Sequence, residues 1–286
     1  MMDGELTGSI KQAARPATFP DGTSYTSLSV TDTSRIGRTL GETSRAIEIA
    51  ALEAGIVPER YARNLKTLST HNQVTLLEST VAIVGLGGLG GGVVEMLARI
   101  GIGTLILIDG DQFEDSNLNR QFLSSHQGLA TSKAEAARDR VHRINASVST
   151  ECRSEFFTAR NAAELLKGTQ IVVDCLDNLP ARFDLEEAAK AEGIPMVSAA
   201  VAGNAGHITT IFPEDIGLRL IYGEPGSMAP KGAETALGTL VPAVTLLASL
   251  ECSEVVKILL NQGKLLRNRL LAIDLADHTY EVMDLR

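Results

Sequence analysis

A glycine-rich turn is the first segment whose residue types and spacing indicate chemistry. Its members are Gly85, Gly87, Gly88 and Gly90. They follow the apolar run 81–84 at the GxGxxG spacing, which lets the backbone turn sharply and approach a phosphate bound by N–H groups of the next helix. Gly91 and Gly92 stand where a P-loop would carry Lys and Ser or Thr, so the sequence excludes a P-loop NTPase.

An acidic residue ends the next apolar run. Asp109 follows residues 105–108, at the position where a carboxylate can bind the hydroxyls of a ribose. Together with the glycine-rich turn, Asp109 fits a nicotinamide dehydrogenase, a flavoprotein or another enzyme with a nucleotide in a Rossmann crevice. These two features leave the choice between them open.

The polar residues after Asp109 favour a triphosphate over a dinucleotide. They are Asp111, Ser116, Asn117, Asn119, Arg120 and Gln121. Arginine offers a planar fork of donors and asparagine an amide that orients an oxygen, and both suit charge that moves on a triphosphate. Lys133, at the start of the next expected helix, is placed to meet a phosphate. A dehydrogenase needs none of these groups here, because the adenosine end of its cofactor is already held.

A second acidic motif follows the apolar run 171–173. Asp177 and Asn178 lie just past this expected strand, at the same sheet edge as the glycine-rich turn. A carboxylate there can hold Mg²⁺ between phosphates, because Mg²⁺ binds through few protein oxygens together with those of a nucleotide. We therefore expect Asp177 to be the magnesium ligand.

In combination, these motifs resemble those of the ThiF/MoeB/HesA family of adenylating enzymes, relatives of the ubiquitin-activating enzymes. The resemblance runs from about Arg60 to Leu285. It implies the use of ATP and Mg²⁺ and the attack of a carboxylate on the α-phosphorus, giving an acyl-adenylate and pyrophosphate. In the best-known members the carboxylate is the C-terminal glycine of a ubiquitin-like sulfur carrier protein that ends in Gly-Gly, in thiamine or molybdopterin sulfur chemistry.

The resemblance also implies nucleotide-binding roles by position. Gly88 matches the turn residue that touches the nucleotide, and Asp109 matches the ribose ligand. Residues 116–120 match the segment on the phosphate side, and Lys133 matches the phosphate-binding lysine. Asp177 matches the aspartate linked to magnesium.

One arginine is expected to act in another subunit. The stretch Arg60-Tyr-Ala-Arg63 is similar to a family motif whose second arginine reaches the partner's ATP site, so Arg63 implies a homodimer. The expected catalytic residues are then Arg63, Arg120, Lys133 and Asp177. No general base is required, because a carboxylate nucleophile is already ionised at neutral pH.

The cysteines depart from the family pattern. Many relatives hold structural zinc with two CxxC pairs, whereas Cys152, Cys175 and Cys252 are widely separated, so we expect no zinc. Some relatives carry a cysteine for a thioester or persulfide in the crossover loop, which corresponds to residues 224–237 and contains none. Adenylation without sulfur handover is therefore the expected activity.

Gly203–Gly206 and His207 resemble the segment below the activated C-terminus, and a plain strand connection is the alternative.

Two other functions stay open. The same chemistry can act on a small carboxylic acid or a tRNA-borne carboxylate, and a nucleotide-binding scaffold without turnover needs only the nucleotide site. The net charge of −9 offers no basic stripe and makes nucleic acid an improbable partner.

Alternating apolar runs and helical patterns predict the architecture. The expected strands are 81–84, 105–108, 171–173, 196–200, 270–274 and 279–285, and the expected helices are 93–100, 132–144, 181–191 and 240–261. Such runs indicate a parallel sheet covered on both faces. We predict a doubly wound, mostly parallel, Rossmann-like α/β fold with a helical N-terminal region and a small C-terminal β extension.

The composition divides the 286 residues into two parts. Residues 1–45, rich in Ser and Thr with Pro16 and Pro20, indicate an N-terminal arm that can be flexible, and residues 46–286 form the expected adenylation domain. The most apolar stretch, 239–250, is shorter than the ~20 residues of a bilayer span. The N-terminus lacks the apolar core of a secretory signal. We therefore expect a soluble, cytoplasmic protein without a membrane partner.

Overall fold

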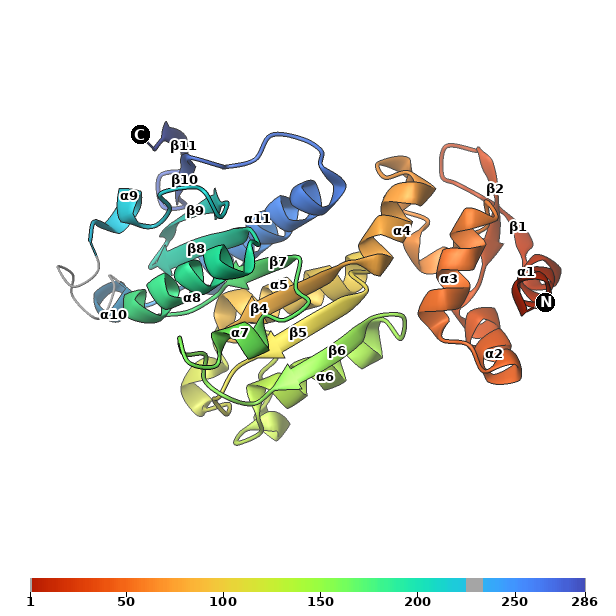
Figure 1. Ribbon diagram of the computed structural model, residues 1–286, viewed down its shortest axis with the longest axis horizontal. Helices are drawn as coiled ribbons and strands as arrows, with labels where there is room; N and C mark the ends of the chain where they lie inside the picture. The colour runs from red at the N-terminus through yellow and green to blue at the C-terminus, as the bar shows by residue number, and fades with distance from the viewer. Residues whose placement is uncertain (1, 225–233, 286) are drawn as a thin grey trace.

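The computed structural model describes residues 2–224 and 234–285. Within these ranges, an eight-stranded sheet has the order β11-β10-β9-β8-β7-β4-β5-β6 (Figure 1). Its strands are β4 (Thr80–Val84), β5 (Thr104–Ile108), β6 (Ser149–Arg153), β7 (Ile171–Asp174), β8 (Met196–Ala202), β9 (Ala205–Ile211), β10 (Arg269–Asp274) and β11 (Thr279–Asp284). Strands β4 to β8 pair in parallel and β9 to β11 extend the sheet antiparallel, so the predicted mostly parallel sheet is confirmed.

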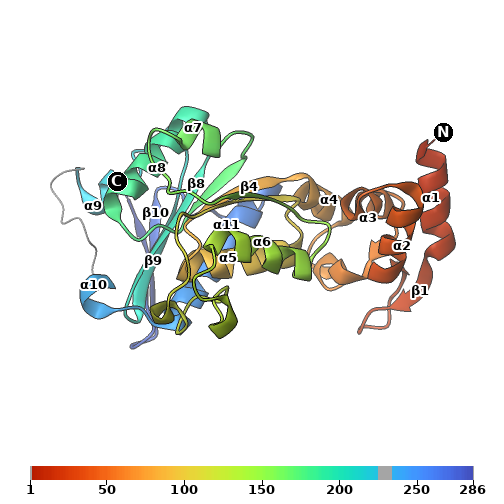
Figure 2. The ribbon, with the colours of Figure 1, turned by 90° about the horizontal axis from the view of Figure 1, so that it is seen from below.

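Helices cover both faces of this sheet (Figure 2). One face packs against α5 (Gly88–Ile100), α6 (Lys133–Ile144) and α11 (Val241–Leu260), and the other against α7 (Ala162–Leu165) and α8 (Leu179–Glu192). Neighbouring residues of a strand point to opposite faces, so Ile83 joins the first core and Ala82 the second. Strands buried on both faces appear as continuous apolar runs, which is why the sequence predicted them well.

Two strands of the sheet were not predicted. Strand β6 reads Ser-Thr-Glu-Cys-Arg, and as an edge strand it keeps only intermediate or exposed side chains, so it carries no apolar run. Strand β9 begins at Ala205, inside the segment whose glycines suggested a turn, and it pairs antiparallel with β8 over seven residues. A β hairpin therefore extends the sheet in the segment for which the sequence left open a substrate-facing turn or a plain strand connection.

The N-terminal region differs from the expected arm. It contains α1 (Met2–Ala13), β1 (Arg15–Thr18), β2 (Ser24–Leu28), α2 (Val30–Leu40), α3 (Ser44–Glu53) and β3 (Val57–Pro58), at the end of the molecule away from β11 (Figure 1). Ile10, Leu28 and Ile36 share a core with Ile47 of α3. The Ser and Thr residues that suggested a linker include helix caps: the Ser29 hydroxyl accepts the Asp32 N–H at 3.0 Å.

A buried polar cluster links this region to the sheet. The Arg60 guanidinium lies 3.0 Å from the carboxylate of Glu48, which is 1% exposed, and it also donates to Asn145 Oδ1 at the end of α6. The Asn145 amide donates to the Tyr61 hydroxyl at 2.9 Å and to the Ala98 carbonyl at 3.0 Å. Arg60 therefore holds the segment before the sheet in place, through contacts that a one-dimensional motif does not reveal.

Short elements complete the described chain: the 3₁₀ turns η1 (Glu59–Tyr61), η2 (Asn64–Lys66), η3 (Asp115–Asn117) and η4 (His126–Gly128), and the helices α4 (Thr70–Glu78), α9 (Arg219–Tyr222) and α10 (Glu234–Leu237). Residues 225–233 of the predicted crossover loop lie outside the described residues. Across the described ranges, no helix combines the length and the apolar character that a bilayer crossing requires.

Candidate active site

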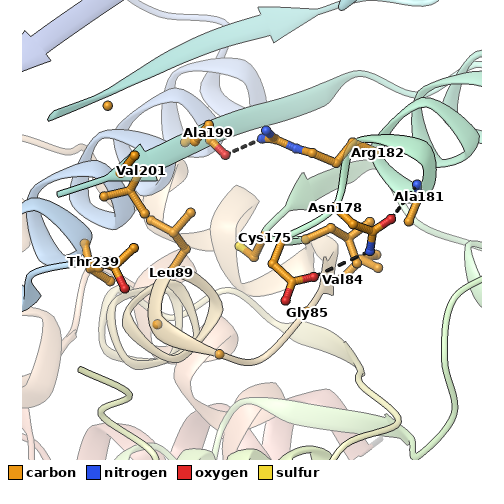
Figure 3. Close-up of a pocket in the computed structure, with 18 of the residues that line it drawn as sticks. Val84, Gly85, Leu89, Cys175, Asn178, Ala181, Arg182, Ala199, Val201 and Thr239 are labelled. Atoms are coloured by element: carbon orange, nitrogen blue, oxygen red, sulfur yellow. Dashed lines mark hydrogen bonds between the residues drawn. The ribbon is translucent and has the colours of Figure 1, made fainter. Parts of the chain in front are cut away.

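A cavity of about 950 Å³ opens at the carboxyl ends of β4, β5 and β7 and continues along β8 and β9 (Figure 3). In parallel α/β sheets this edge is where ligands bind. Most of the predicted site residues line it: Gly85, Gly87, Gly88, Asp109, Asp111, Asn119, Arg120, Gln121, Lys133, Asp177 and Asn178. Segments more than ninety residues apart in the sequence therefore meet around one space.

The glycine-rich turn needs its glycines for two close approaches. Gly85 has a φ of +90°, and a Cβ there would lie 2.6 Å from the Cys175 carbonyl oxygen. A Cβ on Gly90 would lie 1.9 Å from the carbonyl oxygen of Gly85. Gly90 thus allows the turn to close without lining the cavity itself. The first N–H groups of α5, from Gly88 onward, are left for an anion at the helix N-terminus.

Asp109 is fixed by two backbone N–H groups. Its Oδ2 accepts from Leu86 at 2.7 Å and its Oδ1 from Asp111 at 2.8 Å. These bonds tie the end of β5 to the glycine-rich turn and keep the carboxylate oriented. Each oxygen retains a second lone pair for a ribose hydroxyl, the predicted ligand.

The cationic groups on the phosphate side pair with neighbours from the same part of the cavity. Lys133 Nζ, on a side chain only 9% exposed, lies 3.0 Å from Asp111 Oδ2. Arg120 Nη1 donates to the Ser116 carbonyl at 2.8 Å and to Asn119 Oδ1 at 2.9 Å. Both cations line the cavity, so a polyphosphate can compete for them without a change of fold.

The polar groups of the cavity fit a magnesium triphosphate. Gln121 is 6% exposed, and its Oε1 has no hydrogen-bond partner in the described part of the chain. Asp177 is exposed, and its carboxylate makes one long contact, 3.5 Å, with the Asn178 amide. The described residues hold no group of three or more metal-ligating side chains. Mg²⁺ requires only one or two protein carboxylates when phosphates and water supply the rest.

Three other predicted residues lie outside the cavity lining. Asn117 is 8% exposed and closes the turn η3, with its Oδ1 accepting the Glu114 N–H at 3.1 Å. Ser116 contributes its carbonyl to Arg120 and its hydroxyl to the Asn117 amide. Both therefore shape the loop that carries Arg120. Arg63 is exposed between η1 and η2 and does not line this subunit's cavity.

Sequence reasoning missed Arg182, the most extensively bonded cation of the site. Its Nε donates to Asp174 Oδ2 at 2.8 Å, its Nη1 to the Tyr222 hydroxyl at 3.0 Å, and its Nη2 to Ser198 Oγ and the Ala199 carbonyl. Figure 3 draws the contact between Arg182 and Ala199. Burial acts to lower the pKa of Arg182, but Asp174 outweighs it, so the pKa lies above its usual range. The available signal was its place in the first turn of α8, four residues after Asn178, whose side chain caps that helix.

Three titratable groups on this side of the site have shifted pKa values: Cys175 and His207 line the cavity, and Glu251 is buried beside Cys175. Burial raises the pKa values of Cys175 and Glu251 well above their usual range, and neighbouring acidic groups add to both shifts. Glu251 is 0% exposed, 3.9 Å from the Cys175 thiol. His207 has a pKa lowered to about 4, first by burial and then by the charge of Arg182. At neutral pH the cavity wall therefore presents the Cys175 thiol and the neutral imidazole of His207.

Comparisons with known proteins agree with this geometry. The ThiF family matches residues 61–286. The SAMP-activating enzyme E1 of Haloferax volcanii is 34% identical over 233 residues, which are 80% of this chain and 85% of that protein. The adenylyltransferase and sulfurtransferase MOCS3 of Drosophila yakuba is 34% identical over 245 residues. These cover 84% of this chain but 53% of that protein, so the chain spans about half the length of this relative.

Solved structures with the same fold include E. coli MccB with ATP. It has a TM-score of 0.68 at 21% identity, covering 90% of this chain and 79% of that one. The structure of PaaA has a TM-score of 0.66 at 24% identity, covering 80% and 82%. These likenesses confirm the predicted fold, and the curated relatives confirm the predicted enzyme class. The chain therefore belongs to the ThiF family of E1-like adenylyltransferases.

Proposed function

We propose that this enzyme uses Mg²⁺ and ATP to adenylate the C-terminal carboxylate of a ubiquitin-like carrier protein that ends in Gly-Gly. One observation carries the proposal: a single cavity holds Arg120, Lys133 and Asp177 and continues past them to the β8–β9 hairpin. The part lined by Arg120 and Lys133 carries the positive charges that a triphosphate needs, and the cavity continues beyond it toward the β8–β9 hairpin, where the end of an acceptor chain can lie. The names of the curated relatives, a SAMP-activating enzyme and an adenylyltransferase, point to the same chemistry.

The reaction is an in-line substitution at phosphorus. A carboxylate oxygen of the acceptor forms a bond to the α-phosphorus, the bond from that phosphorus to the α,β-bridging oxygen breaks, and pyrophosphate leaves with the electron pair. Asp109 holds the ribose, and Lys133 and Arg120 compensate the charge that develops on the phosphates. No proton is transferred in this step, because the carboxylate nucleophile is already ionised at neutral pH.

Asp177 would hold the magnesium ion. When bound, Mg²⁺ supplies charge neutralisation between phosphate oxygens. Asp177 supports this role because it is exposed, follows the end of β7 by three residues and lines the cavity beside the helix cap Asn178.

The proposal includes a homodimer in which Arg63 acts on the partner's ATP. Two observations support this role: Arg63 is exposed, and the ion pair of nearby Arg60 with buried Glu48 fixes the segment 60–63 that carries it. Mixing two inactive variants, Arg63→Ala and Arg120→Ala, should restore up to about a quarter of the wild-type activity if subunits exchange and each site draws Arg63 from its neighbour. A mixture as inactive as its components would contradict action in trans.

Pyrophosphate exchange tests the proposed reaction. The protein, Mg·ATP and a purified ubiquitin-like carrier ending in Gly-Gly should incorporate labelled pyrophosphate into ATP, and a carrier lacking its last two glycines should not support exchange. Exchange with small carboxylic acids alone would move the activity to a small-molecule substrate. ATP binding without exchange for any acceptor would leave a nucleotide-binding scaffold.

A further inference from the structure

The acceptor end of the cavity is defined here as the lining by β8, β9 and α9 together with Arg182 of α8, which bonds to β8 and α9, and it contains the imidazole of His207. His207 lies on β9, three strands from β4 in the sheet order. At about 4.8 Å between adjacent strands, roughly 14 Å separates it from the strand that leads into the glycine-rich turn. A nucleotide held by Asp109 and Lys133 therefore leaves His207 facing the space that remains for the acceptor.

A chain of hydrogen bonds from the buried ion pair fixes this imidazole. A guanidinium only donates, so the Tyr222 oxygen accepts from Arg182 Nη1 at 3.0 Å. The same hydroxyl lies 2.8 Å from His207 Nε2. Arg182 is itself held by Asp174, which is 0% exposed. The ring is therefore oriented by groups that have little freedom to move.

The surroundings keep His207 uncharged. Its cross-strand neighbours on β8 and β10 are Ala200 and Ala272, and Tyr222 of α9 and the Arg182 cation of α8 lie on its open side. Burial and this cation both oppose protonation. A neutral imidazole has one N–H and one lone-pair nitrogen, and the partner of one nitrogen decides which is which.

The other ring nitrogen, Nδ1, makes no hydrogen bond with the described residues, although the ring lines the cavity. We propose that His207 contacts the acceptor: Tyr222 donates to Nε2, and the Nδ1–H donates to an oxygen of the acceptor's carboxyl-bearing end. Arg182 and Tyr222 are positioning residues. This assignment rests on the proposed function.

A neutral donor suits the reaction better than a cation. A protonated imidazole would form an ion pair with the carboxylate and lower its nucleophilicity toward phosphorus. A neutral N–H orients the group at the cost of one ordinary hydrogen bond and leaves its charge in place. Arg182 serves both needs, because the same cation holds Tyr222 and disfavours protonation of His207.

The decisive experiment separates acceptor binding from ATP binding. Pyrophosphate exchange is measured with a purified carrier ending in Gly-Gly, and the dissociation constant of Mg·ATP is measured by calorimetry. His207→Ala should raise the KM for the carrier about tenfold, as expected for the loss of one hydrogen bond, and change the ATP dissociation constant less than twofold. His207→Asn should recover most of the loss, because its amide nitrogen replaces Nδ1–H, and Tyr222→Phe should raise the same KM.

The control is His71→Asn, an exposed histidine on α4, the helix that leads into the amino end of β4, and this variant should leave every value unchanged. An unchanged carrier KM in His207→Ala, or an equal loss of ATP affinity, would overturn the role of His207 while wild-type exchange upholds the proposed function. Absence of wild-type exchange with any Gly-Gly carrier would instead remove the proposed function and this inference with it.

A spectroscopic measurement tests the tautomer in the full-length protein without any carrier. In ¹⁵N-histidine spectra at pH 5.5, one ring of the wild type should remain neutral with its proton on Nδ1, and this signal should vanish in His207→Asn. A protonated ring, or a proton on Nε2, would overturn the inference even if exchange proceeds.

Discussion

The nucleotide end and the acceptor end of the cavity hold their charges in opposite ways. At the nucleotide end, Lys133 pairs with Asp111, a carboxylate that is 54% exposed, and Arg120 bonds to neighbours in its own loop. At the acceptor end, the side chain of Arg182 is 5% exposed and donates four hydrogen bonds to the protein.

This difference in burial separates cations that can exchange their partners for a ligand, Lys133 and Arg120, from a cation whose partners stay fixed, Arg182. Cations that must follow a triphosphate through a substitution need exchangeable, partly solvated partners. A cation that orients other side chains is held more firmly when it is completely buried, because breaking any of its hydrogen bonds would leave a buried polar group unpaired. Both ends carry an arginine, but Arg120 has partners that a ligand can replace, whereas Arg182 has fixed partners and orients them.

The largest expected effect is on stability at the acceptor end. Arg182→Met should lower the free energy of unfolding by about 3–5 kcal/mol, because Asp174 would remain buried without its partner. Urea denaturation measures this loss. Arg35→Met, which breaks an ion pair whose arginine is 56% exposed, should cost under about 1 kcal/mol. Similar losses in both variants would remove the contrast between the fixed cation and a surface cation.

The dependence of the free energy of unfolding on pH should also reveal the lowered pKa of His207 at the acceptor end. His207 has a pKa of about 4 in the folded protein against 6.5 for the free group, so below pH 6.5 the unfolded chain binds more protons. Stability should therefore fall between pH 6.5 and 4, with up to about 3 kcal/mol due to His207. The stability difference between wild type and His207→Asn should shrink by that amount over this range, and a constant difference would contradict a neutral His207.

At the nucleotide end the effect should appear in the rate. Arg120→Ala should slow pyrophosphate exchange by about two orders of magnitude, because a positioned arginine compensates charge in the transition state. The melting temperature should hardly change, since Arg120 lines the cavity and its side-chain hydrogen bonds with the described residues stay within its own loop. Arg143→Ala, an exposed arginine at the end of α6, is the control. Equal exchange rates for wild type and Arg120→Ala would contradict the role of Arg120 in the transition state and leave it at most a role in binding.

The smallest of these effects concerns magnesium. Asp177→Asn should raise the Mg²⁺ concentration for half-maximal exchange about tenfold, because an amide is a weaker ligand than a carboxylate. Asp184→Asn, an exposed position on the adjoining helix α8, should leave the requirement unchanged. An unaltered requirement in Asp177→Asn would assign the metal to other groups.

The two ends also differ in how far the sequence predicts them. Gly85, Asp109 and Lys133 lie in local motifs whose spacing indicates a turn, a strand end and the start of a helix, and all three line the cavity. Arg182 acquires its role from Ser198 and Tyr222, which only folding brings to it.

Outside the cavity, the missed elements have physical explanations as well. Strand β6 lies at the sheet edge and lacks an apolar run, and the N-terminal helices bury few residues each, such as Ile10 and Ile36. Periodicity predicts an element only when the element buries a continuous face. Ser29, one of the residues that indicated an arm, is instead the N-cap of α2, and Thr43 is the N-cap of α3.

Transfer of the nucleotide itself tests the central claim most directly. ATP labelled at the α-phosphate is mixed with the enzyme, Mg²⁺ and a carrier ending in Gly-Gly, and the carrier is separated under mildly acidic denaturing conditions. The account predicts AMP-linked carrier from the α-label and none from ATP labelled at the γ-phosphate. Carrier that stays unlabelled while the cavity binds ATP, or label that arrives from the γ-phosphate, would contradict attack at the α-phosphorus.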